Sequence, residues 1–147
     1  ANGVPGLEIR MPLLFSEGVQ TGRMDIHRFV AVTSTNAAKT YGLYPRKGTI
    51  AIGSDAALAL WDPKKQVKIT ADAIHDNMDY TPYEGMVSNG WPITGINRGR
   101  IVIEDEELKV YRGSRQYLKR QRPEAAKPLN RLVKEIDPKT NFNAKFI

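Results

Sequence analysis

The chain has 147 residues, of which 41% are hydrophobic and none is cysteine, and its net charge at pH 7 is +6. This length allows one substantial core and excludes two large domains, and the lack of cysteine excludes disulfides, thiolate metal ligands and a cysteine nucleophile. No run of about 18 apolar residues is present, and residues 1–6 lack the charged and apolar regions of a signal peptide. We therefore expect a soluble, cytoplasmic protein with no membrane partner.

The positive charge lies near the C-terminal end of the sequence. Residues 113–147 hold nine Lys/Arg and three Asp/Glu, which accounts for the whole excess, whereas residues 1–112 hold 13 basic and 13 acidic residues. Because most of the chain is neutral, a basic body shaped to follow phosphates is not supported. We expect no nucleic-acid partner.

The first part of the chain predicts a loop followed by short helices. Residues 1–6 are rich in Gly and Pro and predict a loop, and the apolar run 11–19 predicts one or two helical turns. Asp25 is placed to cap a helix, in which Phe29 and its apolar neighbours Ile26 and Val30 share one face.

A second helix is expected over residues 36–41. The short oxygen-bearing side chains of residues 34–36 can cap it, because they can accept hydrogen bonds from the free amides of the first turn. Gly42 is expected to end this helix, with Pro45 just beyond it.

The middle of the chain predicts strands. Short β-type runs separated by turn residues occur at 49–52, 57–61 and 66–70, before a long loop or irregular crossing over 71–90. Strand patterns return at 92–96, 100–104 and 108–111, with turns at 97–99 and 105–106. Three strands on each side of the crossing favour half of a β-sandwich. Residues 113–147 are polar and contain three prolines, so we expect them to be disordered or to lie on another subunit.

Residues with catalytic potential are few and scattered. The two histidines, His27 and His75, are far apart and show no metal-binding spacing, and His75 and Asp76 would point to opposite faces of an extended backbone. Asp55 lies in a tight turn, where its carboxylate is expected to bond local backbone amides. A loop cluster of carboxylates is expected to be solvated, namely Asp72, Asp76, Asp79 and Glu84. No serine has an adjacent base, and no glycine-rich phosphate loop occurs. We predict no catalytic and no metal-binding residue on this chain.

The order of the motifs resembles one branch of the amidohydrolases. The runs 28–39, 42–56 and 60–63, and then 79–86, 90–92 and 98–99, are similar to dihydropyrimidinases and hydantoinases, particularly bacterial ones. The resemblance covers residues 1 to about 112. One departure is Ala57, where the family often has Asp.

This resemblance implies an α+β fragment. Residues 1–44 would be the last loop and helices of a (β/α)8 barrel, 45–112 the C-terminal strands of a β-sandwich, and 113–147 an extended tail that contacts other subunits. Asn2 and Gly3 match the family position whose backbone contacts the cyclic substrate, although Asn-Gly is also a common turn pair. The family's two zinc ions are held by residues that precede the region covered, so this chain alone is predicted to be inactive.

The leading hypothesis is the C-terminal part of a zinc-dependent hydrolase that opens dihydropyrimidines or hydantoins to N-carbamoyl amino acids. Its implied partners are the cyclic amide substrate, the remainder of the barrel domain and further copies of itself, in a tetramer. One alternative is a non-enzymatic scaffold similar to the collapsin-response-mediator proteins, which share residues 28–39 and 43–48. Another is a free-standing β-rich binding module, which exposed sheet edges make unfavourable.

Overall fold

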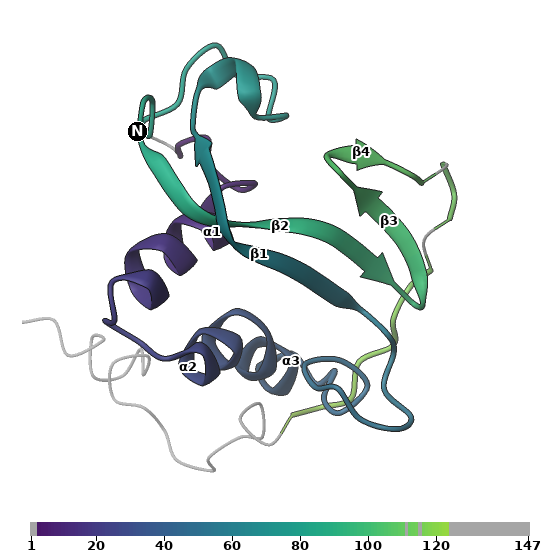
Figure 1. Cartoon of the computed structure of the whole chain (residues 1–147). Helices are drawn as coiled ribbons and strands as arrows, with labels where there is room; N and C mark the ends of the chain where they lie inside the picture. The colour runs from purple at the N-terminus through teal and green to yellow at the C-terminus, as the bar shows by residue number, and fades with distance from the viewer. Residues whose placement is uncertain (1–2, 111, 115, 124–147) are drawn as a thin grey trace, which may run out of the picture.

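The structure is a computed structural model that describes residues 3–110, 112–114 and 116–123. Its first layer is helical, with α1 at Arg10–Leu14, α2 at Ile26–Val30 and α3 at Asn36–Thr40. Its second layer is a sheet in the order β1-β2-β3-β4, with each neighbouring pair antiparallel. Figure 1 shows the helices on one side of β1 and β2. The strands are Leu58–Lys68, Val87–Asn97, Arg100–Glu104 and Glu107–Leu108.

The helical layer begins and ends where the sequence predicts, but the two helices expected after Asp25 form one continuous helical segment over residues 26–40. An Asp25 carboxylate oxygen accepts a hydrogen bond from the backbone N–H of Arg28 at 2.7 Å, which confirms the first cap. The expected second cap is wrong, because a π-helical stretch at Ala31–Thr35 joins α2 directly to α3. Thr35 has helical backbone angles, and its hydroxyl instead donates to the carbonyl of Gly48 at 2.7 Å.

Gly42 ends the helical layer as predicted. Its φ of +67° lies in the left-handed region that glycine adopts without strain. The following amide, from Leu43, then donates to the carbonyl of Ala38 at 2.8 Å. This turns the chain out of α3 and satisfies a carbonyl that the helix itself leaves free.

Of the first three predicted strands, two merge into one and the other is absent. Residues 57–61 and 66–70 largely merge into β1, with an irregular register between Asp62 and Gln66. Pro63 has no backbone N–H, so it interrupts the ladder without ending the strand. The predicted strand at 49–52 is wrong: none of these residues lies in a strand, and the side chains of Ile50 and Ile52 are exposed to solvent. Among the described residues no strand pairs with them.

The second half of the sheet agrees better with the sequence. β2 is longer than predicted, so the crossing ends at residue 86, and β3 has the predicted bounds. Both turns are confirmed. Arg98 and Gly99 have φ of +53° and +75°, and Asp105 and Glu106 have +49° and +68°, which suits tight two-residue hairpins. β4 is shorter than predicted, and Tyr111 lies outside the described residues.

Two apolar clusters hold the layers together. In the first, the ring of Phe15 stacks on Trp61 with centroids 5.0 Å apart and meets Phe29 edge-on at 5.5 Å. In the second, Ile9, Ile69 and Ile74 are buried, with Leu13, Tyr83 and Trp91 packed around them. Both clusters join residues before position 44 to residues after it. Among the described residues, no helix has the length and apolar character needed to cross a membrane.

Candidate functional site

The predicted substrate contact lies at the start of the described chain. Asn2 is outside the described residues, so its position stays a prediction. Gly3 has a φ of +147°, and a side chain added there would meet nothing within 4 Å. Val4, the next residue, is exposed by 61%. Within the described chain, the loop is therefore accessible to solvent at Gly3 and Val4.

A recess adjoins this loop. It has a volume of about 640 Å³ and lies between the loop, α1 and the end of the crossing segment. Its walls are mostly apolar, with Arg10 and Glu17 as the charged residues, and Tyr83 and Met86 contribute from the crossing. Such a surface can hold an apolar group, but it brings together no acid, base and nucleophile.

The two histidines lie on different elements. His27 belongs to α2, whose capping residue is Asp25, and its side chain is exposed. His75 lies in the crossing segment, where its Nδ1 is 3.0 Å from Glu8 Oε1 and its backbone N–H donates to Glu8 Oε2 at 2.7 Å. Asp76 instead accepts from the backbone N–H of Met78 at 3.2 Å, so the expected separation of His75 and Asp76 agrees with the observed partners.

The carboxylate of Glu8 raises the pKa of His75. Its hydrogen bond is the largest cause and its negative charge the second, while partial desolvation opposes the shift and the more distant Glu106 adds to it. Sequence patterns do not predict this pair, because 67 positions separate the two residues.

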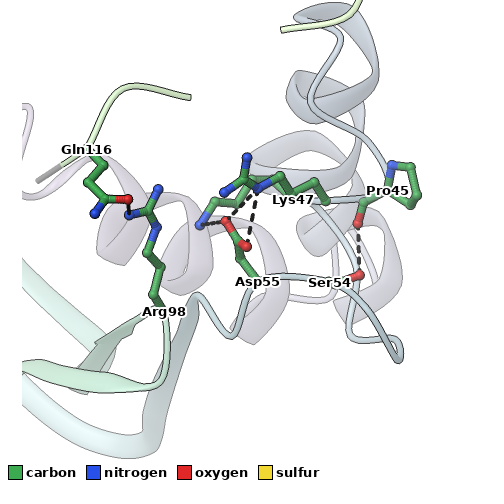
Figure 2. A network of polar contacts seen from close by, with 7 residues as sticks. Pro45, Lys47, Ser54, Asp55, Arg98 and Gln116 are labelled. Atoms are coloured by element: carbon green, nitrogen blue, oxygen red, sulfur yellow. Dashed lines mark hydrogen bonds and ion pairs between the residues drawn. The ribbon is translucent and has the colours of Figure 1, made fainter. Parts of the chain in front are cut away.

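The carboxylate of Asp55 is expected to accept hydrogen bonds from local backbone amides, and this prediction is wrong. It binds two cationic side chains instead. Lys47 Nζ lies 3.3 Å and Arg46 Nε 3.1 Å from Oδ2 of this carboxylate. Figure 2 shows Asp55 facing Lys47. Partial desolvation, the largest single effect, raises the pKa of Asp55, but bonds from Lys47 and then Arg46, and their charges, outweigh it and lower the pKa. The same turn is closed by a hydrogen bond from the Ser54 hydroxyl to the Pro45 carbonyl at 2.8 Å. This network is a structural clamp on the segment after α3.

The carboxylate cluster is only partly solvated. Glu84 Oε2 accepts from the backbone N–H of Ala71 at 2.8 Å and so closes the crossing segment on itself. Within the described residues, no group of three or more His, Asp or Glu side chains could hold a metal ion. Glu84 and Asp76 thus hold the crossing segment in place through bonds to its backbone.

Comparison with known proteins gives the family. The profile of the amidohydrolase family matches residues 3–102, which is more than half of the chain. This chain is an amidohydrolase family member. The resemblance found in the motifs is thereby confirmed over most of the described residues.

The relatives of this amidohydrolase chain have consistent names. Rat (Rattus norvegicus) dihydropyrimidinase is 48% identical over 120 residues, covering 82% of this chain and 23% of the relative. The D-hydantoinase of Geobacillus stearothermophilus is 44% identical over 119 residues, covering 81% and 25%. The chain thus spans about a quarter of the length of the curated relatives it matches.

Solved structures agree with this amidohydrolase assignment. A D-hydantoinase structure superimposes with a TM-score of 0.78 at 39% identity, covering 82% of this chain and 26% of that one. The D-hydantoinase of Thermus sp. gives the same TM-score at 44% identity and the same coverage. The described fold is therefore similar to one part of the hydantoinase structures.

Proposed function

We propose that this chain is the C-terminal part of a zinc-dependent hydrolase that opens dihydropyrimidines or hydantoins to N-carbamoyl amino acids. The observation that carries the proposal is the 48% and 44% identity to a dihydropyrimidinase and a D-hydantoinase across some 80% of the chain. In this proposal residues 1–44 form the last loop and helices of the barrel domain. Residues 45–112 form the C-terminal strands of a β-sandwich.

The role proposed for this chain in catalysis is substrate contact. The backbone at Asn2 and Gly3 would bond the polar edge of the cyclic amide, and the open surroundings of Gly3 are compatible with a ring approaching it. Main-chain groups suit this task because they present fixed donors and acceptors that tell an amide from a hydrocarbon ring.

Metal chemistry would come from outside this chain. The described residues do not fit a zinc pair, because they contain no cluster of three ligand-type side chains. Zinc, where bound, would supply a nucleophilic hydroxide at neutral pH. The ligands must then belong to the remainder of the barrel domain.

The function is tested by hydrolysis of dihydrouracil and hydantoin by the intact enzyme, and the reaction is measured as the loss of ring absorbance. We expect turnover that a zinc chelator abolishes and that added zinc restores. The 147-residue chain alone serves as a control and should give no turnover. No hydrolysis of either ring by the zinc-loaded intact protein would contradict the proposal and favour a scaffold role.

We also propose that the enzyme is a homotetramer to which residues 113–147 contribute. The described part of this tail lies on its own chain: the backbone N–H of Gln121 donates to the Gly42 carbonyl at 2.8 Å, and Arg98 donates to Gln116 at 2.7 Å. Figure 2 shows the second of these contacts beside the Asp55 clamp.

Deletion of residues 114–147 is expected to shift the tetramer towards smaller species in sedimentation velocity. Deletion of 124–147 alone keeps the contacts of Gln116 and Gln121 with their own chain. It therefore separates a role of the tail in subunit assembly from a role in stabilising its own subunit. If both variants still sediment as tetramers, residues 114–147 have no role in assembly.

A further inference from the structure

We propose that Glu8 and His75, together with Tyr83, are positioning residues for the loop 3–9, which carries Gly3, and that they thereby set the affinity for the cyclic amide. This inference rests on the function proposed above and adds to it residues of the crossing segment 69–86, far from the loop in sequence.

The first contact is two-point binding of one carboxylate. Glu8 Oε2 accepts the backbone N–H of His75 at 2.7 Å, and Glu8 Oε1 lies 3.0 Å from the Nδ1 of the same residue. A carboxylate held by both the main chain and the ring of one residue has a defined orientation, whereas a single ion pair at the surface would not. The backbone of Glu8 is therefore held at a fixed place beside the crossing segment.

The second contact is apolar and lies directly next to the first. Ile9 follows Glu8 and is fully buried, and Ile74 precedes His75 and is exposed by only 8%. Both belong to the cluster with Ile69. Two consecutive residues of the loop segment thus dock on two consecutive residues of the crossing, one pair polar and one apolar.

The third contact is nearer to the proposed substrate position. A Cβ placed on Gly6, whose φ is +147°, would lie 3.0 Å from Cε2 of Tyr83, so the ring rests on the loop backbone itself. Figure 1 shows the start of the chain running beside the crossing segment. Only two residues separate Gly6 from Gly3, and such a short span passes a shift at Gly6 on to the substrate contact.

The electrostatics of the pair make its strength depend on pH. Two groups act on His75 by charge, Glu8 from the loop segment and Glu106 from the turn between β3 and β4, and both favour the imidazolium. Because the pKa of His75 is raised in the folded chain, the ionic form of the bond is complete below the ordinary histidine value of about 6.5. It is lost as the pH rises through the raised value, so substrate affinity should fall on the alkaline side.

The test compares variants of the intact enzyme in dihydrouracil hydrolysis. We expect Glu8→Gln and His75→Ala to raise KM by about two- to fivefold, the range for a solvent-exposed ion pair, with kcat nearly unchanged. Asp72→Asn is the matched control, because it removes one carboxylate from the same segment away from Glu8, and its KM should equal that of the wild type. His75→Asn, whose amide nitrogen can replace Nδ1, should restore KM but abolish the rise of KM with pH.

A second readout needs no activity. Hydrogen exchange at the backbone N–H groups of residues 3, 4 and 6–9 in the full chain should be faster in Glu8→Gln than in Asp72→Asn. Unchanged KM in both Glu8→Gln and His75→Ala would overturn the inference. So would a fall in kcat as large as the rise in KM, if His75→Asn does not restore KM. If the wild-type enzyme hydrolyses neither ring, the proposed function fails and the substrate role falls with it, while the exchange rates still report whether Glu8 holds the loop.

Discussion

Replacement of Phe15 by alanine is expected to lower the free energy of unfolding by about 3–5 kcal/mol, the usual cost of emptying a buried aromatic site. Phe15 is exposed by only 6%, stacks on Trp61 at 5.0 Å and meets Phe29 at 5.5 Å. Its ring connects the helical layer to β1, so its loss weakens the interface between the layers. Urea unfolding followed by tryptophan fluorescence measures the change, since Trp61 itself reports it.

Val30→Ala is the control for this variant. Val30 lies in the same helical layer, but 46% of its surface is exposed. A change of less than about 0.5 kcal/mol is expected there, as for most surface substitutions. Equal losses in the two variants would mean that Phe15 does not form the joint between helices and sheet.

Gly90→Ala is expected to cost about 2–5 kcal/mol, because it combines backbone strain with overpacking. Gly90 has a φ of +96°, and a Cβ there would lie 2.4 Å from Cε1 and 2.5 Å from Cδ1 of Phe15. The methyl group must therefore displace a buried ring or distort β2. The same urea titration measures the loss.

The double variant separates the strain from the collision. In the Phe15→Ala background the new methyl group meets no ring, so the cost of Gly90→Ala should fall to the strain alone, about 1–3 kcal/mol. The two single losses should thus not add. Strict additivity would show that Phe15 and Gly90 do not touch.

The helix limits and hairpin turns could be predicted from the sequence because their causes are local. Asp25 and Gly42 act on amides and carbonyls within a few residues, and so do the turns at 97–99 and 105–106. The prediction of a strand at 49–52 is wrong because a strand depends on a partner that can be distant in sequence. Its alternating Thr-Ile-Ala-Ile pattern is typical of a strand, but a strand also needs a partner, and a local pattern does not provide one.

The candidate site divides in the same way. Asn2 and Gly3 came from family resemblance, and Gly3 is accessible as a substrate contact would need to be. The contact between Glu8 and His75 could not be predicted, because it depends on how the crossing segment folds back over the start of the chain. The ion pairs of Asp55 were missed because turn chemistry favours amides, whereas Arg46 and Lys47 are brought close by the loop after α3.

The contacts between residues 3–9 and 69–86 also bear on how this sequence can be recombined with those of other amidohydrolases. A chimera joined near residue 44 would take Glu8 and Gly6 from one parent and His75 and Tyr83 from the other. The two segments would then have to be exchanged together, since the hydrogen bonds and the ring contact between them need both partners. A chimera should therefore take residues 3–9 and 69–86 from the same parent. A junction near residue 44, where the helices give way to the sheet, would separate them.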